Sequence, residues 1–331
     1  MHESIRAHGS TITKVAVRLE RLLAKNRNLK WSRDIKELMF RSETSESANS
    51  LRPFAEFFTN LKSNFEYNKN NWKEKVTTPD GKEYIATAKI FSPNERSTGI
   101  YDRNKPNFIY HHFAGATNPE DHIKMLKILV PDLKGYNIIV VAAHGHSKND
   151  EKNISNPMSR TFTTMEDVQG TIAASVALVD NLAQLNTEKS IYVGISMGGI
   201  VEYWHRFLGN NQFSKSYIIA AHPKADKIFT SYPFSGMFNL SKIEKFKTQF
   251  ARAFEIDEIT TQIKNRFKEV KLYLGTKDSV VNKEIARDMA KKLGIDNISE
   301  YPLDHLSISL AGLNIIKNFK KELSILNSGI I

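Results

Sequence analysis

Short runs of apolar residues alternate with amphipathic stretches along the chain from Trp72 onward. The runs are short and rich in β-branched and aromatic residues, so they predict strands. These predicted strands are Phe108–His111, Ile138–Ala142, Ile191–Val193, Tyr217–Ala221, Val270–Leu274 and Ile298–Tyr301. Helical periodicity lies between them, at about Glu120–Leu133, Met165–Leu185, Met197–Phe207, Lys283–Leu293 and Leu306–Leu326. Because such apolar strands are buried on both faces, the alternation predicts an α/β fold with a mostly parallel central sheet flanked by helices.

Two further strands are expected before this alternation begins. Residues 73–77 and 84–91 are separated by the turn signal Pro79-Asp80-Gly81, which predicts an antiparallel pair. We place the main domain at residues 69–331 on this basis.

The first part of the chain, residues 1–68, has a different pattern. Over residues 11–40 apolar and basic residues occupy opposite faces of a predicted helix, and residues 42–47 form a polar linker. A second helix is expected around residues 53–65. We therefore predict a helical N-terminal extension, which either packs on the main domain or makes weak contact with an anionic membrane through its basic helix.

Residues 222–267 interrupt the alternation between two successive predicted strands. An insertion of this length is expected to contain helices, so we predict a cap or lid over the site. Within it Phe246, Phe250 and Phe254 recur every four residues and would share one helix face. That face either packs on the core or lines an apolar pocket for the acyl part of a substrate.

Composition limits the class of protein. The chain has 331 residues, of which 40% are hydrophobic, and contains no cysteine, which excludes disulfides and thiolate chemistry. No apolar run approaches the ~18 residues that suggest a membrane span. The start, Met1–Arg6, lacks the apolar core of a secretory signal, so a cytoplasmic protein is expected. The net charge of +11 is spread along the chain without a dense block, so no nucleic-acid partner is expected.

The most informative motif is Gly194-Ile195-Ser196-Met197-Gly198, which lies between a predicted strand and a predicted helix. This arrangement is typical of a nucleophile elbow, in which a tight strand-to-helix turn presents one serine hydroxyl. Glycines are needed beside that serine because the strand and helix nearly collide there. The amides at the start of the following helix would stabilise negative charge that develops during acyl transfer.

With this motif and the strand–helix alternation, the chain from about Trp72 to its end resembles the α/β-hydrolase superfamily. The motif follows the fifth predicted strand, where the superfamily places its nucleophile. The superfamily's order of nucleophile, acid and histidine is matched by Ser196, Asp278 and His305, the last two lying in loops after predicted strands. The resemblance implies a catalytic triad of these residues. Asp226 is the reserve acid, because some members carry the acid after the preceding strand.

The resemblance also implies an oxyanion hole made of two backbone N–H groups. One belongs to Met197, the residue after the nucleophile. The other is expected in His112-Phe113-Ala114-Gly115, which resembles the His-Gly-x-Gly loop of the family. Phe113 stands where the family has glycine, so the donor is either Phe113 or Ala114.

Five histidines fall near the ends of predicted strands: His111, His112, His144, His146 and His222. A zinc site is conceivable from such a group, but no metal-binding spacing such as HExxH accompanies it. We interpret them as loop and pocket residues, and expect neither a metal nor a cofactor.

The predicted function is that of a serine hydrolase acting on a small-molecule carboxylic ester or thioester, with a hydrophobic acyl part, through an acyl-enzyme intermediate. The lipase-like cap makes a monoacylglycerol-lipase-like activity one form of this prediction. An acyltransferase would use the same residues and differ only in its acceptor. A non-catalytic binding protein of this fold is the other alternative, although the intact triad argues against it.

Overall fold

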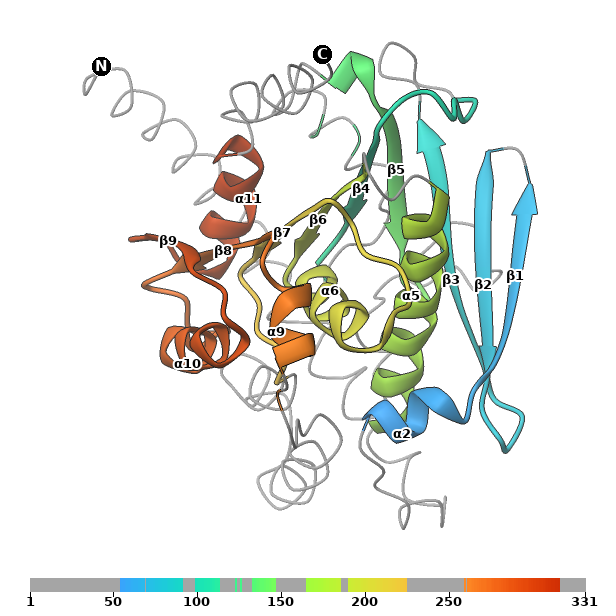
Figure 1. Ribbon diagram of the computed structural model, residues 1–331, viewed down its shortest axis with the longest axis horizontal. Coiled ribbons are helices and arrows are strands. Elements are labelled where there is room, and N and C mark those ends of the chain that lie inside the picture. Colours follow the sequence, from blue (N-terminus) through green and yellow to red (C-terminus); the bar gives the residue numbers. More distant parts are fainter. Residues whose placement is uncertain are drawn as a thin grey trace, which may run out of the picture.

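The computed structural model describes residues 54–68, 70–91, 99–113, 123, 126, 133–146, 165–185, 190–224, 259 and 261–315 (Figure 1). These residues contain one nine-stranded sheet with helices on both faces. The strands are β1 (Lys62–Asn68), β2 (Asn71–Thr77), β3 (Glu83–Phe91), β4 (Asn107–His111), β5 (Asn137–Ala142), β6 (Ser190–Ile195), β7 (Lys215–Ile219), β8 (Val270–Gly275) and β9 (Asn297–Tyr301). The helices are α2 (Phe54–Thr59), the 3-10 turn η4 (Leu133–Gly135), α5 (Met165–Leu185), α6 (Met197–Leu208), α9 (Thr261–Arg266), α10 (Lys283–Leu293) and α11 (His305–Ile315).

The strands lie in the order β1-β2-β3-β5-β4-β6-β7-β8-β9. From β1 to β3 they are antiparallel, and β3 also pairs with β5 in the antiparallel sense. All other pairs, from β5 and β4 through to β9, are parallel. The carboxyl ends of β4, β6, β7, β8 and β9 therefore lie along one edge, which is where an open sheet of this kind places its functional loops.

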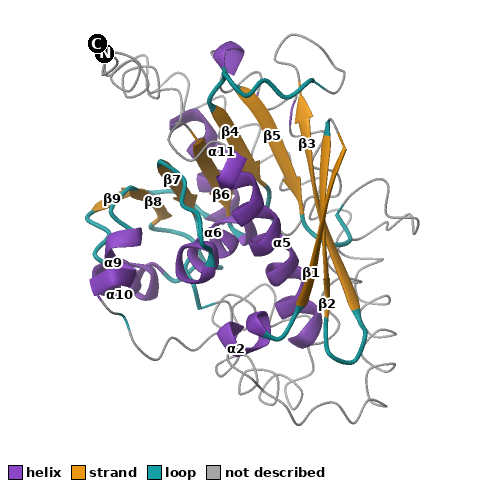
Figure 2. Ribbon diagram, turned by 45° about the vertical axis from the view of Figure 1, so that its right-hand side comes forward, coloured by secondary structure: helices purple, strands orange, loops and turns teal. Residues whose placement is uncertain are grey.

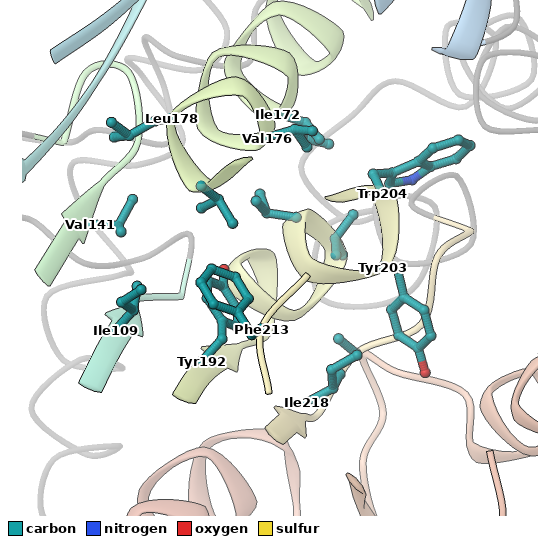
Figure 3. Close-up of a cluster of buried hydrophobic side chains, with 14 of the residues drawn as sticks. Ile109, Val141, Ile172, Val176, Leu178, Tyr192, Tyr203, Trp204, Phe213 and Ile218 are labelled. Carbon is teal, nitrogen blue, oxygen red and sulfur yellow. The ribbon is translucent and has the colours of Figure 1, made fainter. Parts of the chain in front are cut away.

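The core is divided by the sheet into two apolar clusters. On one face, alternate strand residues such as Ile109, Tyr192 and Ile218 pack against α5 and α6 (Figure 3). On the other face, their neighbours Tyr110, Val193 and Ile219 pack with Ile308 of α11 and other residues. The rotated view in Figure 2 shows α5 and α6 in front of the central strands. Burial on both faces explains why β4, β5 and β6 are continuous apolar runs.

The predicted α/β fold with a mostly parallel sheet is confirmed. Helices α5 and α10 have the predicted bounds, and α6 ends one residue later than expected. Asn282 caps the start of α10 by accepting hydrogen bonds from two backbone amides, and Gly294 ends the helix in the left-handed conformation. These are local signals, so the sequence could display them.

The prediction of helix over residues 53–65 is wrong after Thr59. Residues 62–68 form β1, which pairs with β2 along its whole length. Phe65 and Tyr67 alternate with polar residues, a period of two that is typical of a strand. The main sheet thus begins ahead of the expected domain boundary at residue 69, and Ser196 follows the sixth strand rather than the fifth.

Several predictions fall outside the described residues. They concern the helix over 11–40, the linker 42–47, the reserve acid Asp226 and most of the cap at 222–267. Within the described part of the chain, no helix combines the length and the apolar character needed to cross a membrane.

Candidate active site

Ser196 stands alone between the end of β6 at Ile195 and the start of α6 at Met197. Its backbone has φ 50°, a region that residues with a side chain adopt rarely. The Ser196 N–H donates a hydrogen bond of 2.8 Å to the carbonyl of Ile219 on β7, which holds the strained turn in place. Such strain, supported by its surroundings, is typical of functional positions.

The glycines around Ser196 allow β4, β6 and α6 to approach one another closely. A Cβ atom on Gly194 would lie 2.4 Å from the carbonyl oxygen of Gly198, and one on Gly198 would lie 2.4 Å from the carbonyl oxygen of His111. Both distances are far below van der Waals contact, so any side chain would force the backbone apart. The expected need for glycine on both sides of Ser196 is therefore seen directly.

The structure brings the three predicted catalytic residues together. His305 Nε2 lies 3.1 Å from Ser196 Oγ, and His305 Nδ1 lies 2.8 Å from Asp278 Oδ2. Ser196 is 7% exposed and the Asp278 side chain 1%, whereas the His305 side chain is 22% exposed. The serine and the carboxylate are thus sheltered, and the imidazole between them reaches the surface.

The loop after β8 orients the Asp278 carboxylate. Oδ1 accepts hydrogen bonds of 2.8 Å from the backbone amides of Val280 and Val281, which leaves Oδ2 for His305. Neighbouring Asp304 has another task, because its Oδ1 accepts from the Ser307 amide and caps the start of α11. Asp304 is therefore engaged elsewhere and is a poor partner for the adjacent His305.

The loops after β8 and β9 are also bound to each other. The amides of Thr276 and Lys277 donate to the carbonyls of Tyr301 and Leu303, at 2.7 and 3.1 Å. A Cβ on Gly275 would lie 2.4 Å from the Leu303 carbonyl oxygen. Asp278 and His305 are therefore held in register by backbone contacts between their two loops.

Two observations identify the fold. The sheet is mostly parallel with helices on both faces, and a serine lies in a strained turn between one of its central strands and the following helix. The chain has the α/β-hydrolase fold. This assignment depends on the strand order and on the turn at Ser196.

Comparisons with known proteins are distant. No family model and no curated protein matches the sequence. Among solved structures, this chain is similar to a carboxylesterase of the thaumarchaeon Nitrososphaera gargenis, with 13% identity, a TM-score of 0.47 and coverage of 77% of this chain and 100% of the other. An esterase of Pyrococcus furiosus has 14% identity and a TM-score of 0.41, with 80% and 87% covered. Est1E of Butyrivibrio proteoclasticus, with bound ferulic acid, has 15% identity and a TM-score of 0.45, with 72% and 95% covered.

The predicted oxyanion donors are placed only in part. Met197 is the first residue of α6, and the first amides of a helix have no acceptor within it. The end of β4 lies beside this turn, because the Gly198 amide donates to the His112 carbonyl at 3.2 Å. Phe113 follows directly and is half-buried, while Ala114 lies outside the described residues.

Contacts of His111, His112, His144 and His146 fix local structure at the ends of the strands. His111 Nδ1 lies 2.9 Å from the Tyr192 hydroxyl, and His112 Nε2 accepts from the Ala143 amide. His144 Nδ1 accepts from the Ile85 amide, and His146 Nδ1 lies 2.9 Å from the His144 carbonyl. In the described ranges, no three potential metal ligands gather in a way that could hold an ion.

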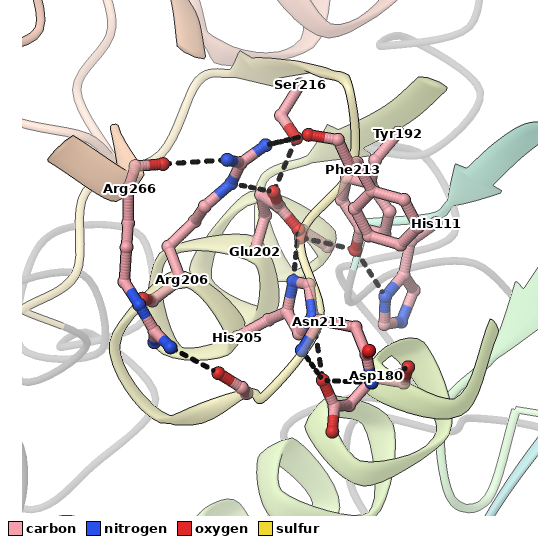
Figure 4. A network of polar contacts seen from close by, with 12 residues as sticks. His111, Asp180, Tyr192, Glu202, His205, Arg206, Asn211, Phe213, Ser216 and Arg266 are labelled. Atoms are coloured by element: carbon pink, nitrogen blue, oxygen red, sulfur yellow. Dashed lines mark hydrogen bonds and ion pairs between the residues drawn. The ribbon is translucent and has the colours of Figure 1, made fainter. Parts of the chain in front are cut away.

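A buried polar network on α6 is a feature that the sequence did not reveal (Figure 4). Glu202, His205 and Arg206 are all buried, and Glu202 contacts both of the others. His205 also lies 3.5 Å from Asp180 on α5, and Arg206 donates to Ser216 Oγ on β7. The i, i+4 spacing of Glu202 and Arg206 was the available signal, but it is as common on exposed helix faces.

The network perturbs its own ionisation. Burial alone would raise the pKa of Glu202, but the adjacent Arg206 and His205 lower it overall. Burial alone would lower the pKa of His205, yet Glu202 and Asp180 raise it. The charged forms therefore stabilise one another, and they join the helix that follows Ser196 to α5 and β7.

Proposed function

We propose that this protein is a serine hydrolase that cleaves a small-molecule carboxylic ester or thioester. One observation carries the proposal: Ser196 Oγ, the His305 imidazole and the Asp278 carboxylate form a continuous chain of contacts at 3.1 and 2.8 Å. This is the arrangement in which an imidazole removes the proton of a serine hydroxyl as the hydroxyl attacks a carbonyl.

In the proposed reaction, Ser196 Oγ attacks the carbonyl carbon while His305 Nε2 accepts its proton. Asp278 Oδ2 keeps a proton on His305 Nδ1 and stabilises the imidazolium that forms. The tetrahedral oxyanion would be bound by the Met197 amide and by the amide of Phe113 or Ala114. His305 then returns the proton to the leaving group, and water hydrolyses the acyl-enzyme by the same steps.

The test is labelling with a fluorophosphonate, which reacts with a serine activated in this way, together with hydrolysis of a panel of chromogenic esters and thioesters. We expect wild type to be labelled, and Ser196→Ala to lose labelling and about 10⁴-fold or more of kcat. Ser214→Ala is a matched control, because this partly buried serine donates to the Ser190 carbonyl and lies outside the proposed triad. Equal labelling of wild type and Ser196→Ala would refute the proposal.

A hydrophobic acyl part is proposed from the aromatic residues of the 222–267 insertion, which include Phe246, Phe250 and Phe254. Apolar pockets gain roughly 0.8 kcal/mol for each buried CH₂ group, so kcat/KM should rise about threefold to fourfold per added CH₂ until the pocket is full. Esters of increasing chain length measure this directly. A kcat/KM that falls from acetate onward would argue against an apolar acyl pocket.

A further inference from the structure

The Tyr192 hydroxyl links β4, β6 and α6 through buried hydrogen bonds to His111 and Gly198, and its contact with His111 is drawn in Figure 4. It donates to the Gly198 carbonyl oxygen at 2.9 Å. His111 Nδ1 lies 2.9 Å from the same hydroxyl. Both side chains are completely buried, so water does not compete for these contacts.

The direction of the hydrogen bonds follows from the chemistry of the groups. A carbonyl oxygen only accepts, so the single hydroxyl proton of Tyr192 points to Gly198. The hydroxyl oxygen must then accept from His111, which carries its proton on Nδ1. Burial lowers the pKa of His111 to about 3, so the imidazole is neutral and the chain keeps one arrangement across the working pH range.

These hydrogen bonds hold the peptide groups on both sides of Gly198. The Gly198 amide donates to the His112 carbonyl at 3.2 Å, while its carbonyl accepts from Tyr192. In an α-helix that carbonyl also faces the amide four residues ahead, so the hydroxyl is a donor beyond what the backbone requires. Gly198 is two residues from Ser196 and one from Met197.

We propose that Tyr192 and His111 are positioning residues that orient the first turn of α6 against the end of β4. This inference rests on the proposed function of Ser196. The two residues fix the positions of Ser196 Oγ and the Met197 amide relative to the reacting carbonyl. Neither side chain touches the substrate. They act through the Gly198 peptide, and small displacements of a reacting group are costly to the rate.

The first experiment compares Tyr192→Phe with wild type by steady-state hydrolysis of a chromogenic ester and by the rate of fluorophosphonate labelling. We expect kcat and the labelling rate to fall about tenfold, with KM changed less than about twofold, because ground-state binding does not use the displaced groups. Tyr203→Phe is the matched control. Tyr203 lies on α6 and is buried, as Tyr192 is on β6. The Tyr203 hydroxyl has no hydrogen-bond partner among the residues that the structure describes.

A double variant separates positioning from folding. Tyr192→Phe alone leaves the His111 Nδ1 proton buried without its acceptor, whereas His111→Leu with Tyr192→Phe removes both polar groups. We expect the double variant to recover the melting temperature while kcat stays about tenfold low, because Gly198 still lacks the hydroxyl. If Tyr192→Phe proves too unstable to assay, the double variant carries the test.

Three outcomes would overturn the inference: kcat unchanged in Tyr192→Phe, an equal fall in Tyr203→Phe, or kcat restored together with stability in the double variant. Failure of the proposed function looks different, because wild type itself would then show neither labelling nor hydrolysis. A labelled wild type with an unaltered Tyr192→Phe overturns only the positioning role.

Discussion

The buried carboxylate of Glu202 provides the sharpest test of the forces that hold this fold. Its Oε1 accepts from Arg206 Nε at 2.7 Å and from the Ser216 hydroxyl, and its Oε2 lies 3.2 Å from His205 Nδ1. Glu202→Gln keeps the size of the side chain and one acceptor oxygen. It removes the negative charge and places an amide that can only donate against these donors.

The expected loss follows from what remains buried. Arg206 is 2% exposed and His205 is fully buried, so Arg206 would keep its charge in a buried region without the Glu202 anion, and His205 would keep Asp180 as its acidic neighbour. Breaking a buried ion pair by neutralising one partner costs about 3–5 kcal/mol. Since Arg206 keeps its contacts with the carbonyls of Arg266 and Phe213, we expect the free energy of unfolding to fall by about 3 kcal/mol, the lower end of that range. At roughly 2–4 °C per kcal/mol, this loss lowers Tm by about 6–12 °C.

Urea unfolding followed by circular dichroism measures the difference in the free energy of unfolding. Glu284→Gln is the control, because Glu284 lies on the surface of α10 with a side chain 64% exposed, 3.7 Å from Lys283. Glu284→Gln should lower the free energy of unfolding by less than about 0.5 kcal/mol. A loss below about 1 kcal/mol for Glu202→Gln, or one that vanishes in 1 M salt as a surface pair would, refutes the reasoning.

The same pair of proteins tests the pH dependence. The lowered pKa of Glu202 means that its contribution is fully present above the unfolded value of about 4.3 and is lost as pH falls through the folded-state pKa. The gap between wild type and Glu202→Gln should therefore narrow in acid below about pH 4. The raised pKa of His205 has the opposite sign: its contribution is full below about pH 6.5 and is lost as pH rises through the raised value. Urea titrations at several pH values would show both slopes, and a gap that is constant with pH would contradict them.

Two further predictions concern the site itself. Asp278→Asn should lower kcat about 10⁴-fold in the ester assay, because an amide neither holds the tautomer of the imidazole nor stabilises its charged form. Asp304→Asn, which retains an N-cap, should stay within a fewfold of wild type, and similar losses in both would contradict the assignment. Gly198→Ala should lower kcat about 100-fold and reduce Tm, because its Cβ would meet a carbonyl oxygen at 2.4 Å. Gly135→Ala is the control, since a Cβ there has open space and should change neither kcat nor Tm. A Gly198→Ala variant with wild-type activity would refute this steric argument.

The elements that could be predicted from the amino-acid sequence are those whose causes are local. The apolar runs that form β4, β5 and β6 are continuous because both faces of a central strand are buried. The α10 helix could be predicted at its observed bounds, since its cap residues and apolar spacing lie within it. The glycines beside Ser196 likewise indicate, from their spacing alone, the close approach of strand and helix that their contacts require. Strand β1 was missed because its alternation is limited to Phe65 and Tyr67, and because residues 62–68 all stay exposed, so no buried face extends that pattern.

Which side chains meet depends on the tertiary structure alone. Ser196 and His305 are 109 residues apart in the chain, and their contact exists because parallel strands carry both loops to one edge of the sheet. The contact between His111 and Tyr192 likewise spans 81 residues and joins two neighbouring strands. Periodicity along a chain records which face of an element is buried, since that depends on local geometry. It does not record the partner across the core, because that partner is set by how separate elements pack.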